Sequence, residues 1–425
     1  MKQKLKTLFQ RDFIRNVILL ATGTAGAQII TVLAAPFITR IYGPEAYGIL
    51  GTFTAMTNII IPVAALTYPI AIVLPKKEEE AIGLVQLSLL VTVGVATASL
   101  SILLIFNKQI VNIFNLNEIS NYIYLIPILV IFAGIMQTTQ QWLIRTNQFS
   151  INAKAVFYQS VIINSSKIWL GYLYPIAIVL VLLTTLSNAV RAILMILFSR
   201  LPKINFRNGN IFKLARKHYD FPIYRAPEEL LSGISHSIPV LMLTVFFGPA
   251  SAGFYSIGRS VLSMPSQFIG VAIGDVFYPK AAEMYNKKKS ITELIFKTTV
   301  VLAGIGIIPF GSVVLFGPQL FSFVFGEAWY TAGSYARWIA LWAFTNFINK
   351  PSVRALAILN AQKFHLIYTV FGLVCRLIVL LLGFYIFASD KVAVGLFGVV
   401  AALLNVGLIS ITLYLSVKKY KDKQI

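Results

Sequence analysis

Long apolar runs follow one another along almost the whole chain, separated by short stretches that contain charged residues, Gly or Pro. A helix that crosses a bilayer needs about 20 apolar residues, and the chain has twelve runs of that order. The predicted spans are residues 15–39, 47–75, 81–106, 121–143, 155–173, 175–198, 223–247, 250–277, 292–316, 335–358, 366–388 and 392–417. The pattern predicts an all-α integral membrane protein with twelve transmembrane helices. The first run is too long for the apolar core of a signal peptide, so we expect it to stay in the protein.

Composition agrees with this reading and narrows the function. Of the 425 residues, 57% are hydrophobic and only 12% are charged, whereas soluble domains carry about twice that charge. The spans leave no room for a separate soluble domain, which excludes most enzyme classes. The single cysteine, Cys375, excludes an intrachain disulfide and a cysteine-based zinc site, and we expect it to be a packing thiol. The sequence predicts no metal and no cofactor.

The net charge of +21 would point to nucleic acid in a soluble protein, but the positions of the basic residues argue otherwise. With both termini placed in the cytoplasm, 25 of the 36 Lys and Arg residues lie in cytoplasmic segments and 3 lie in external ones. This asymmetry follows the positive-inside rule. It predicts an even number of spans with both termini cytoplasmic, and no nucleic-acid partner.

An internal repeat divides the chain. The segment from Tyr42 to Gly48 (YGPEAYG) returns 205 residues later from Phe247 to Gly253 (FGPASAG), and Pro62 and Pro265 match at an offset of 203. In each copy Gly can end one helix and Pro can start the next. We therefore predict two parallel six-helix lobes, at 1–199 and 223–425, joined by a basic cytoplasmic linker at 200–222 with a short surface helix within 213–219. Paired repeats of this kind are typical of transporters with a site between the halves.

The segment Arg40 to Gly48 (RIYGPEAYG), the basic N-terminus, the six-plus-six spans and the basic linker together resemble the Wzx-type polysaccharide biosynthesis flippases. These O-antigen flippases belong to the multidrug/oligosaccharidyl-lipid/polysaccharide (MOP) exporter superfamily. The resemblance implies a V of two lobes in a bacterial inner membrane. It also implies export of an undecaprenyl-pyrophosphate-linked oligosaccharide, in lipopolysaccharide or related biosynthesis, from the cytoplasmic to the periplasmic leaflet. A polysaccharide polymerase and a chain-length regulator are the protein partners that it implies.

Basic residues inside the spans predict a cationic cavity. Charges at mid-bilayer cost about 2.5–3.5 kcal/mol each on insertion scales, so they usually face a cavity or a partner. Guanidinium groups bind phosphate oxygens through paired donors. We therefore expect a pyrophosphate site, and the candidate substrate-binding residues are Arg259, Arg376, Lys350, Arg225 and Arg191. For Arg225 and Arg191, which lie near a span's end, snorkelling to the surface is the slightly favoured alternative.

The seventh predicted span carries acids on the same helical face as a histidine. Arg225 can pair with Glu228 or Glu229 one turn away, which leaves a second carboxylate for Arg259, a proton or a cation. His236 lies on the same face. The candidates for coupling transport to a proton or Na⁺ are Glu228, Glu229 and His236.

Amide side chains predict a polar lining for sugar hydroxyls, which need both donors and acceptors. The candidates are Gln28, Asn58, Gln137, Gln141 and Gln267. Gln140 lies on the face shared by Gln137 and Gln141. Rows of this kind are equally typical of hydrogen bonds between helices.

Three other functions remain open. A multidrug antiporter would share the architecture but favour acids in its cavity. A lipid II flippase typically has two extra helices and more arginines on its first spans. A membrane polymerase or ligase would need catalytic groups on a large external loop, and the longest external segments, about 107–120 and 317–334, hold only three charged residues. We therefore predict a transporter rather than an enzyme; the glycan and the coupling ion stay undetermined.

Overall fold

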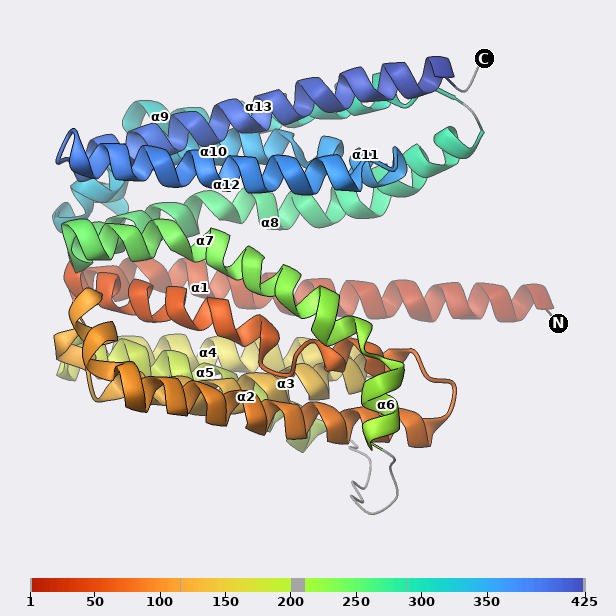
Figure 1. The fold of residues 1–425 in the computed structure, drawn as a ribbon, viewed down its shortest axis with the longest axis horizontal. Helices are drawn as coiled ribbons and strands as arrows, with labels where there is room; N and C mark the ends of the chain where they lie inside the picture. Colours follow the sequence, from red (N-terminus) through yellow and green to blue (C-terminus); the bar gives the residue numbers. More distant parts are fainter. Residues whose placement is uncertain (1, 115, 200–210, 288, 423–425) are drawn as a thin grey trace. The chain divides into compact units, whose positions relative to one another are not determined.

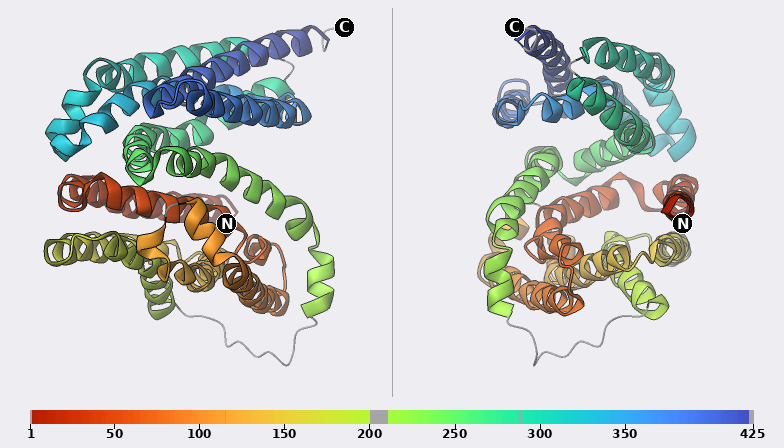
Figure 2. Two further views of the ribbon diagram at one scale, coloured as in Figure 1. Left: turned by 60° about the vertical axis from the view of Figure 1, so that its left-hand side comes forward. Right: turned by 90° about the vertical axis from the view of Figure 1, so that its right-hand side faces the viewer.

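The computed structural model describes residues 2–114, 116–199, 211–287 and 289–422, with the side chains of residues 2–22, 267–276 and 421–422 left aside. Within these ranges the regular elements are all helices. The chain forms two compact units, Met1–Pro249 and Ala250–Ile425, in each of which long helices lie roughly alongside one another (Figure 1 and Figure 2).

Twelve helical elements make up the first unit over its described residues. They are α1 (Lys2–Ile60), η1 (Ile61–Val63), η2 (Tyr68–Val73), α2 (Glu78–Ile113), η3 (Asn117–Ile119), η4 (Tyr122–Tyr124), α3 (Leu125–Arg145), α4 (Phe149–Leu173), α5 (Ala177–Phe198), α6 (Ile211–Lys217), η5 (Phe221–Arg225) and α7 (Ala226–Phe247).

The second unit, outside residues 288 and 423–425, consists of six helices and one 3₁₀ turn. They are α8 (Pro249–Asn286), α9 (Thr292–Phe325), η6 (Glu327–Trp329), α10 (Tyr330–Ile348), α11 (Lys350–Ile358), α12 (Gln362–Tyr385) and α13 (Asp390–Asp422).

The fold class predicted from the sequence is confirmed: the protein is an all-α, multi-pass membrane protein. Each of the twelve predicted spans coincides with helical structure. In the described part of the chain, eight helical segments are long and apolar enough to cross a membrane, one of them running through the first two predicted spans from Gly23 to Val73. The number of twelve crossings itself stays a prediction.

Both Gly-Pro pairs of the repeat lie where one helix ends and the next begins. Gly43 interrupts α1 with φ 69° and ψ 171°, and Gly248 ends α7 with φ 86°. These are left-handed conformations that glycine adopts without the steric cost of a Cβ. Pro44 and Pro249 then open the following helices, as the sequence predicts.

The second predicted span is not the continuous helix expected over 47–75. Its α-helix ends at Ile60, and the chain continues as two 3₁₀ turns, η1 and η2. Between them Leu66 and Thr67 take positive φ values of 44° and 58°, which is uncommon for residues with a Cβ. Pro62 and Pro69, which lack an N–H, lie at the starts of the two turns and explain why the α-helical ladder stops.

Small residues let helices of the first unit approach closely. A Cβ on Gly23 would lie 2.5 Å from the Cβ of Ala153, so α1 and α4 touch there. A Cβ on Gly233 would lie 2.7 Å from the carbonyl oxygen of Asn58, so α7 packs directly on α1. The division at residues 200–222 that the repeat predicts remains a prediction, and residues 200–210 lie outside the described ranges.

The short helix expected within the linker, at 213–219, is present as α6 over Ile211–Lys217. Its Leu214 is buried and lies over Gly83 of α2, where a glycine Cβ would come within 2.4 Å of the leucine. Lys217 adds an ion pair of 2.6 Å with Glu80. These contacts hold α6 across the start of α2 (Figure 1).

Candidate functional site

The interrupted second span lines a polar cavity in the first unit. This amide pocket has a volume of about 230 Å³. Its lining residues are Pro62, Thr67, Pro69 and Ile70 from the interrupted segment, Gln137, Gln140 and Gln141 from α3, and Glu229 from α7. Non-helical backbone at membrane depth is tolerated where it lines a cavity, and this pocket is where the chain departs from α-helix.

Side chains of α3 satisfy carbonyl groups of the interrupted segment. The Gln137 Nε2 atom donates to the Ile61 carbonyl oxygen at 2.7 Å. Two turns further on, the Arg145 Nη1 atom donates to the carbonyl oxygens of Ile72 at 3.0 Å and Pro75 at 2.7 Å. Because buried carbonyl groups need a partner, these bonds stabilise a backbone that the helix ladder no longer supports.

One charged residue, the acid Glu229, is part of the pocket lining. It accepts a hydrogen bond of 3.3 Å from Arg225 Nη2, one turn earlier. The pair therefore brings a carboxylate and its counter-charge to the edge of the pocket. Both side chains are substantially exposed, at 50% for Arg225 and 35% for Glu229, so other partners can reach them.

Arg191 lies behind the pocket rather than in its lining. Its Nη2 atom donates to the side-chain oxygens of Asn152 at 3.1 Å and Gln140 at 3.4 Å. Gln140 is itself a lining residue. Arg191 thus orients the side-chain amide of Gln140, and it influences the pocket by holding that amide in place.

The second unit holds a different polar site, which we call the arginine–aromatic cluster: Tyr255, Arg259, Trp342, Arg376 and Phe397. The Arg259 Cζ atom lies 5.9 Å from the centre of the Trp342 ring, within the range of cation–π attraction. The Tyr255 hydroxyl interacts with Arg259, and both Arg259 and Arg376 act on it electrostatically.

The aromatic rings hold the cluster together. Phe397 of α13 meets Tyr255 of α8 and Trp342 of α10 edge to face, with ring centres 6.2 Å and 6.4 Å apart. The Arg376 Nε atom is buried and has no hydrogen-bond partner in the described part of the chain. A buried donor without a partner is costly, so an acceptor bound there would stabilise this guanidinium.

The remaining predicted site residues lie elsewhere. Lys350 opens α11 and is close enough to Arg354 for the two charges to repel. Glu228, His236 and Asn58 are exposed, while Gln28 is half-buried on α1. Gln267 lies in α8 among the residues whose side chains are not described.

Some residues of the two sites carry no sequence signal of a site. Thr67 belongs to the pocket only because the chain is left-handed there, and no Gly or Asn marks the turn. Trp342 and Phe397 read as ordinary apolar residues of a span. Pro62 and Pro69 do give a signal, because two prolines seven residues apart in one span disturb its helix.

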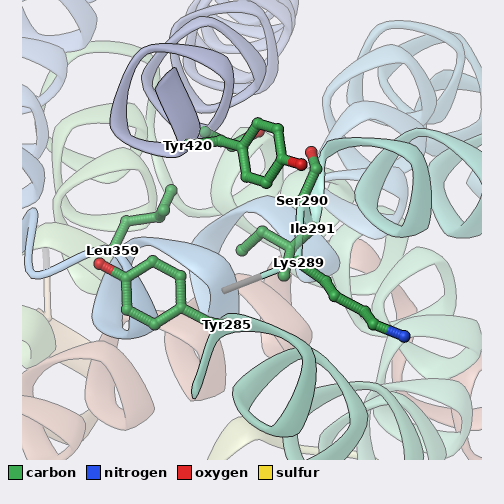
Figure 3. A pocket seen from close by; sticks show the side chains of 7 residues that line it. Tyr285, Lys289, Ser290, Ile291, Leu359 and Tyr420 are labelled. Carbon is green, nitrogen blue, oxygen red and sulfur yellow. The ribbon is translucent and has the colours of Figure 1, made fainter. Parts of the chain in front are cut away.

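A smaller polar pocket in the second unit is lined by Tyr285, Lys289, Ser290, Ile291, Leu359, Ser416 and Tyr420. Figure 3 shows the ring of Tyr420 beside Ser290, with the Lys289 side chain extending away from it. Its volume of about 10 Å³ leaves room for a single water molecule at most. It is therefore too small for a substrate.

The family model described as "Polysaccharide biosynthesis protein" matches residues 37–334. The chain belongs to this family. No curated protein sequence gives a match.

Solved structures show which fold this polysaccharide biosynthesis protein has. It is similar to an inward-facing multidrug resistance MATE family transporter of the MOP superfamily, with a TM-score of 0.75 and 14% identity over 94% of this chain and 96% of that one. It is also similar to the lipid II flippase MurJ in an inward closed conformation, with a TM-score of 0.74 and 13% identity over 93% and 87% of the two chains. A MOP superfamily transporter from Pyrococcus furiosus gives a TM-score of 0.62 and 14% identity, with 96% of each chain covered. The protein thus has the MOP superfamily fold, as its sequence resemblance implies.

Proposed function

We propose that this polysaccharide biosynthesis protein is a flippase for an undecaprenyl-pyrophosphate-linked oligosaccharide. It would carry the repeat unit from the cytoplasmic to the periplasmic leaflet of a bacterial inner membrane, with both termini cytoplasmic. The observation that carries the proposal is that Arg259 and Arg376 both lie near the Tyr255 side chain in a chain of this family. Guanidinium groups bind phosphate oxygens through paired donors, and a pyrophosphate offers several charged oxygens.

The amide pocket supplies the second half of the proposal. Sugar hydroxyls both donate and accept hydrogen bonds, and three glutamine side chains with Thr67 offer both kinds of group. In this proposal the pocket receives part of the glycan at one stage of transport, and the arginine–aromatic cluster receives the pyrophosphate.

Alternating access would move the substrate between the leaflets, with the two six-helix repeats rocking against one another. The protein would make and break no covalent bond of its substrate. Glu229 is the best placed of the three candidates because it lines the pocket, and its bond to Arg225 must open before it takes up a proton or a cation. Glu228 and His236 remain alternatives. A polysaccharide polymerase and a chain-length regulator would act on the exported unit.

The test is transport in vesicles that contain only the purified protein and a fluorescent lipid-linked oligosaccharide, with a membrane-impermeant quencher to report the exposed leaflet. We expect Arg376→Gln and Arg259→Gln to slow translocation about tenfold or more, since a charge-assisted hydrogen bond contributes about 1.5–3 kcal/mol. Lys297→Gln is the matched control, because it removes a cation from an exposed pair with Glu293. Normal translocation by both arginine variants would overturn the pyrophosphate site. Uptake of an organic cation instead of the glycan lipid would favour an antiporter.

A further inference from the structure

An apolar crevice runs between α9 and α10 in the second unit, away from the residues assigned to transport above. Its volume is about 280 Å³. Its walls are five residues of α9 between Ile307 and Leu315 and three residues of α10 between Ala340 and Phe344, all of them apolar. Ile307 and Leu315 are more than 60% exposed, so the crevice is open along one side.

Helices α9 and α10 contact each other toward the two ends of the crevice, and the crevice is the space left along the helices between these contacts. At one end Gly317 and Gly333 meet backbone to backbone, and a Cβ on Gly333 would come within 2.3 Å of the Gly317 carbonyl oxygen. At the other end the rings of Phe310, Phe344 and Phe347 pack together, with centres 5.8–6.0 Å apart. Small residues draw the helices together at the first end, and the rings hold them apart at the second.

A glycine leaves the middle of the crevice empty. Gly311 lines it, and a Cβ built on Gly311 would have no neighbour within 4 Å. In a bilayer such a space is filled by hydrocarbon, because an empty cavity forfeits the dispersion contacts of the atoms that line it. The walls therefore fit an acyl chain. Side chains at the ends of the crevice must determine which lipid headgroup is bound.

Arg337 lies at the end formed by the two glycines. Its Nη2 atom donates to the carbonyl oxygen of Leu315, a crevice residue, at 2.9 Å. That carbonyl lies where α9 departs from helical geometry at Phe316 (φ −117°, ψ 17°) and Pro318 follows. One N–H of the guanidinium thus serves the kink, and the others remain for a second acceptor.

The Nε atom of Arg337 is buried and has no hydrogen-bond partner among the described residues. A buried donor without an acceptor costs about 1–3 kcal/mol, so an acceptor that reached this edge would stabilise the guanidinium. The Nη groups carry further N–H donors, and a guanidinium binds phosphate oxygens through paired donors. An arginine that closes an apolar crevice is the arrangement expected for a lipid with a phosphate headgroup.

The position along the helices fits the depth of one leaflet. Residues 307 to 315 span about 12 Å at 1.5 Å per residue, and one leaflet contributes about 15 Å of hydrocarbon. Arg337 is seven residues after the start of α10 at Tyr330, within the reach of an arginine that snorkels to the headgroups. A chain much longer than one leaflet would leave most of its length outside the crevice.

We propose that the α9–α10 crevice is a specific site for an anionic glycerophospholipid of the surrounding bilayer, with one acyl chain along Gly311 and the headgroup phosphate on Arg337. This lipid is not the transported substrate. It fills the crevice of the second unit and fixes the separation of α9 and α10. The site does not depend on the flippase proposal, because it uses none of the residues assigned to transport.

Native mass spectrometry of the full-length purified protein, titrated with phosphatidylglycerol after removal of bound lipid, tests the proposal. We expect one site that binds phosphatidylglycerol about tenfold or more tightly than diacylglycerol, which has the chains but not the phosphate. Arg337→Gln should abolish this preference and Arg337→Lys should keep part of it. Lys391→Gln, which removes an exposed cation elsewhere in the second unit, is the matched control.

The hydrocarbon half of the site has its own pair of variants. Gly311→Leu fills the crevice and should weaken binding of both lipids about tenfold. Gly304→Leu is the control, because Gly304 is an exposed residue of the same helix with open space around it and does not line the crevice. Since Gly311→Leu does not touch the Arg337 hydrogen bond to Leu315, it tests the site even if Arg337→Gln loosens the α9 kink.

Three results would overturn the proposal. Equal affinity for phosphatidylglycerol and diacylglycerol would show that no phosphate is recognised. Equal binding to the Gly311→Leu and Gly304→Leu proteins would show that the lipid lies elsewhere. Displacement of phosphatidylglycerol by a polyprenyl phosphate at lower concentration would assign the crevice to an isoprenoid lipid.

Discussion

The side chain of Gln137 bonds the carbonyl oxygen of Ile61 at 2.7 Å, in the segment where the second span ceases to be an α-helix. One member of the α3 glutamine row is therefore structural, although it also lines the pocket. Its neighbour Gln141 lines the same pocket. Replacing each residue in turn therefore distinguishes an effect on the stability of the fold from an effect on contact with a ligand.

Replacing Gln137 by Leu should lower the thermal unfolding temperature of the protein in detergent by a few degrees, because a hydrogen bond of this kind contributes about 1 kcal/mol. Gln141→Leu should leave the unfolding temperature almost unchanged and reduce oligosaccharide translocation. Intrinsic fluorescence during heating gives the first quantity and the vesicle assay the second. Equal loss of stability in the two variants would contradict this division.

Trp342 positions Arg259, so its replacement should act on transport through that guanidinium. Cation–π attraction contributes about 0.5–1 kcal/mol or more, and we expect Trp342→Leu to slow translocation about two- to fivefold. Trp342→Phe keeps an aromatic face and should recover most of the rate. A rate with Phe as low as that with Leu would show that the indole serves only to fill space.

The contact between Gly317 and Gly333 leaves no room for a methyl group. Gly333→Ala would place a Cβ within 2.3 Å of a backbone oxygen and 2.4 Å of the Pro318 Cα, so α9 and α10 must separate, at a cost of about 1–3 kcal/mol. We expect a clear fall in the unfolding temperature. Gly94→Ala is the matched control, since nothing lies within 4 Å of that position in α2 and alanine favours a helix.

The docking of α6 should weaken as the pH falls. Burial lowers the pKa of His218 below its ordinary value of 6.5, and nearby Lys217 lowers it further, while Glu80 and Asp220 oppose the change. The neutral form is therefore favoured when α6 is docked. Docking is strongest above pH 6.5 and is progressively lost as the pH falls from 6.5 through the lowered pKa, because the undocked histidine binds a proton more readily.

A spin label on Arg216→Cys, in a protein with Cys375→Ser, measures this effect, since Cys375 is the only native cysteine. Label mobility should rise between pH 7.5 and pH 5. The rise should disappear when His218 is also replaced by Phe, which cannot be protonated. A rise that persists in the His218→Phe protein would assign it to a group other than His218. Glu80 does not titrate in this range, because Lys217 lowers the pKa of its carboxyl below the ordinary value of 4.5.

Local sequence signals were sufficient for the helices and for their junctions at Gly43 and Gly248. Each junction depends on a glycine that takes a positive φ and on the proline that follows it. The two residues are adjacent in the sequence, so the junction can be recognised locally. The interruption after Ile60 was not predictable in the same way. Pro62 and Pro69 fit a bent helix as well as a broken one, and only the bonds from α3 decide between them.

The two sites show the same limit. The spacing of Gln137, Gln140 and Gln141 predicts one polar helix face, but the partner of that face is the interrupted segment, which is far away in the sequence. Arg259 and Arg376 were predicted as interior cations. Their approach through Tyr255 depends on how α8 and α12 pack, and periodicity within one helix does not contain that information.

The left-handed turn at Thr67 has a mechanical consequence. Its hydroxyl donates to the carbonyl oxygen of Phe221 at 3.0 Å, and the neighbouring Tyr68 hydroxyl reaches the Ala215 carbonyl at 3.4 Å. Hydrogen bonds therefore join the interrupted segment, which lines the amide pocket, to the stretch of chain that leads into α7. A ligand that changes the conformation of the segment around Thr67 must therefore either move the chain before α7 or break these two hydrogen bonds.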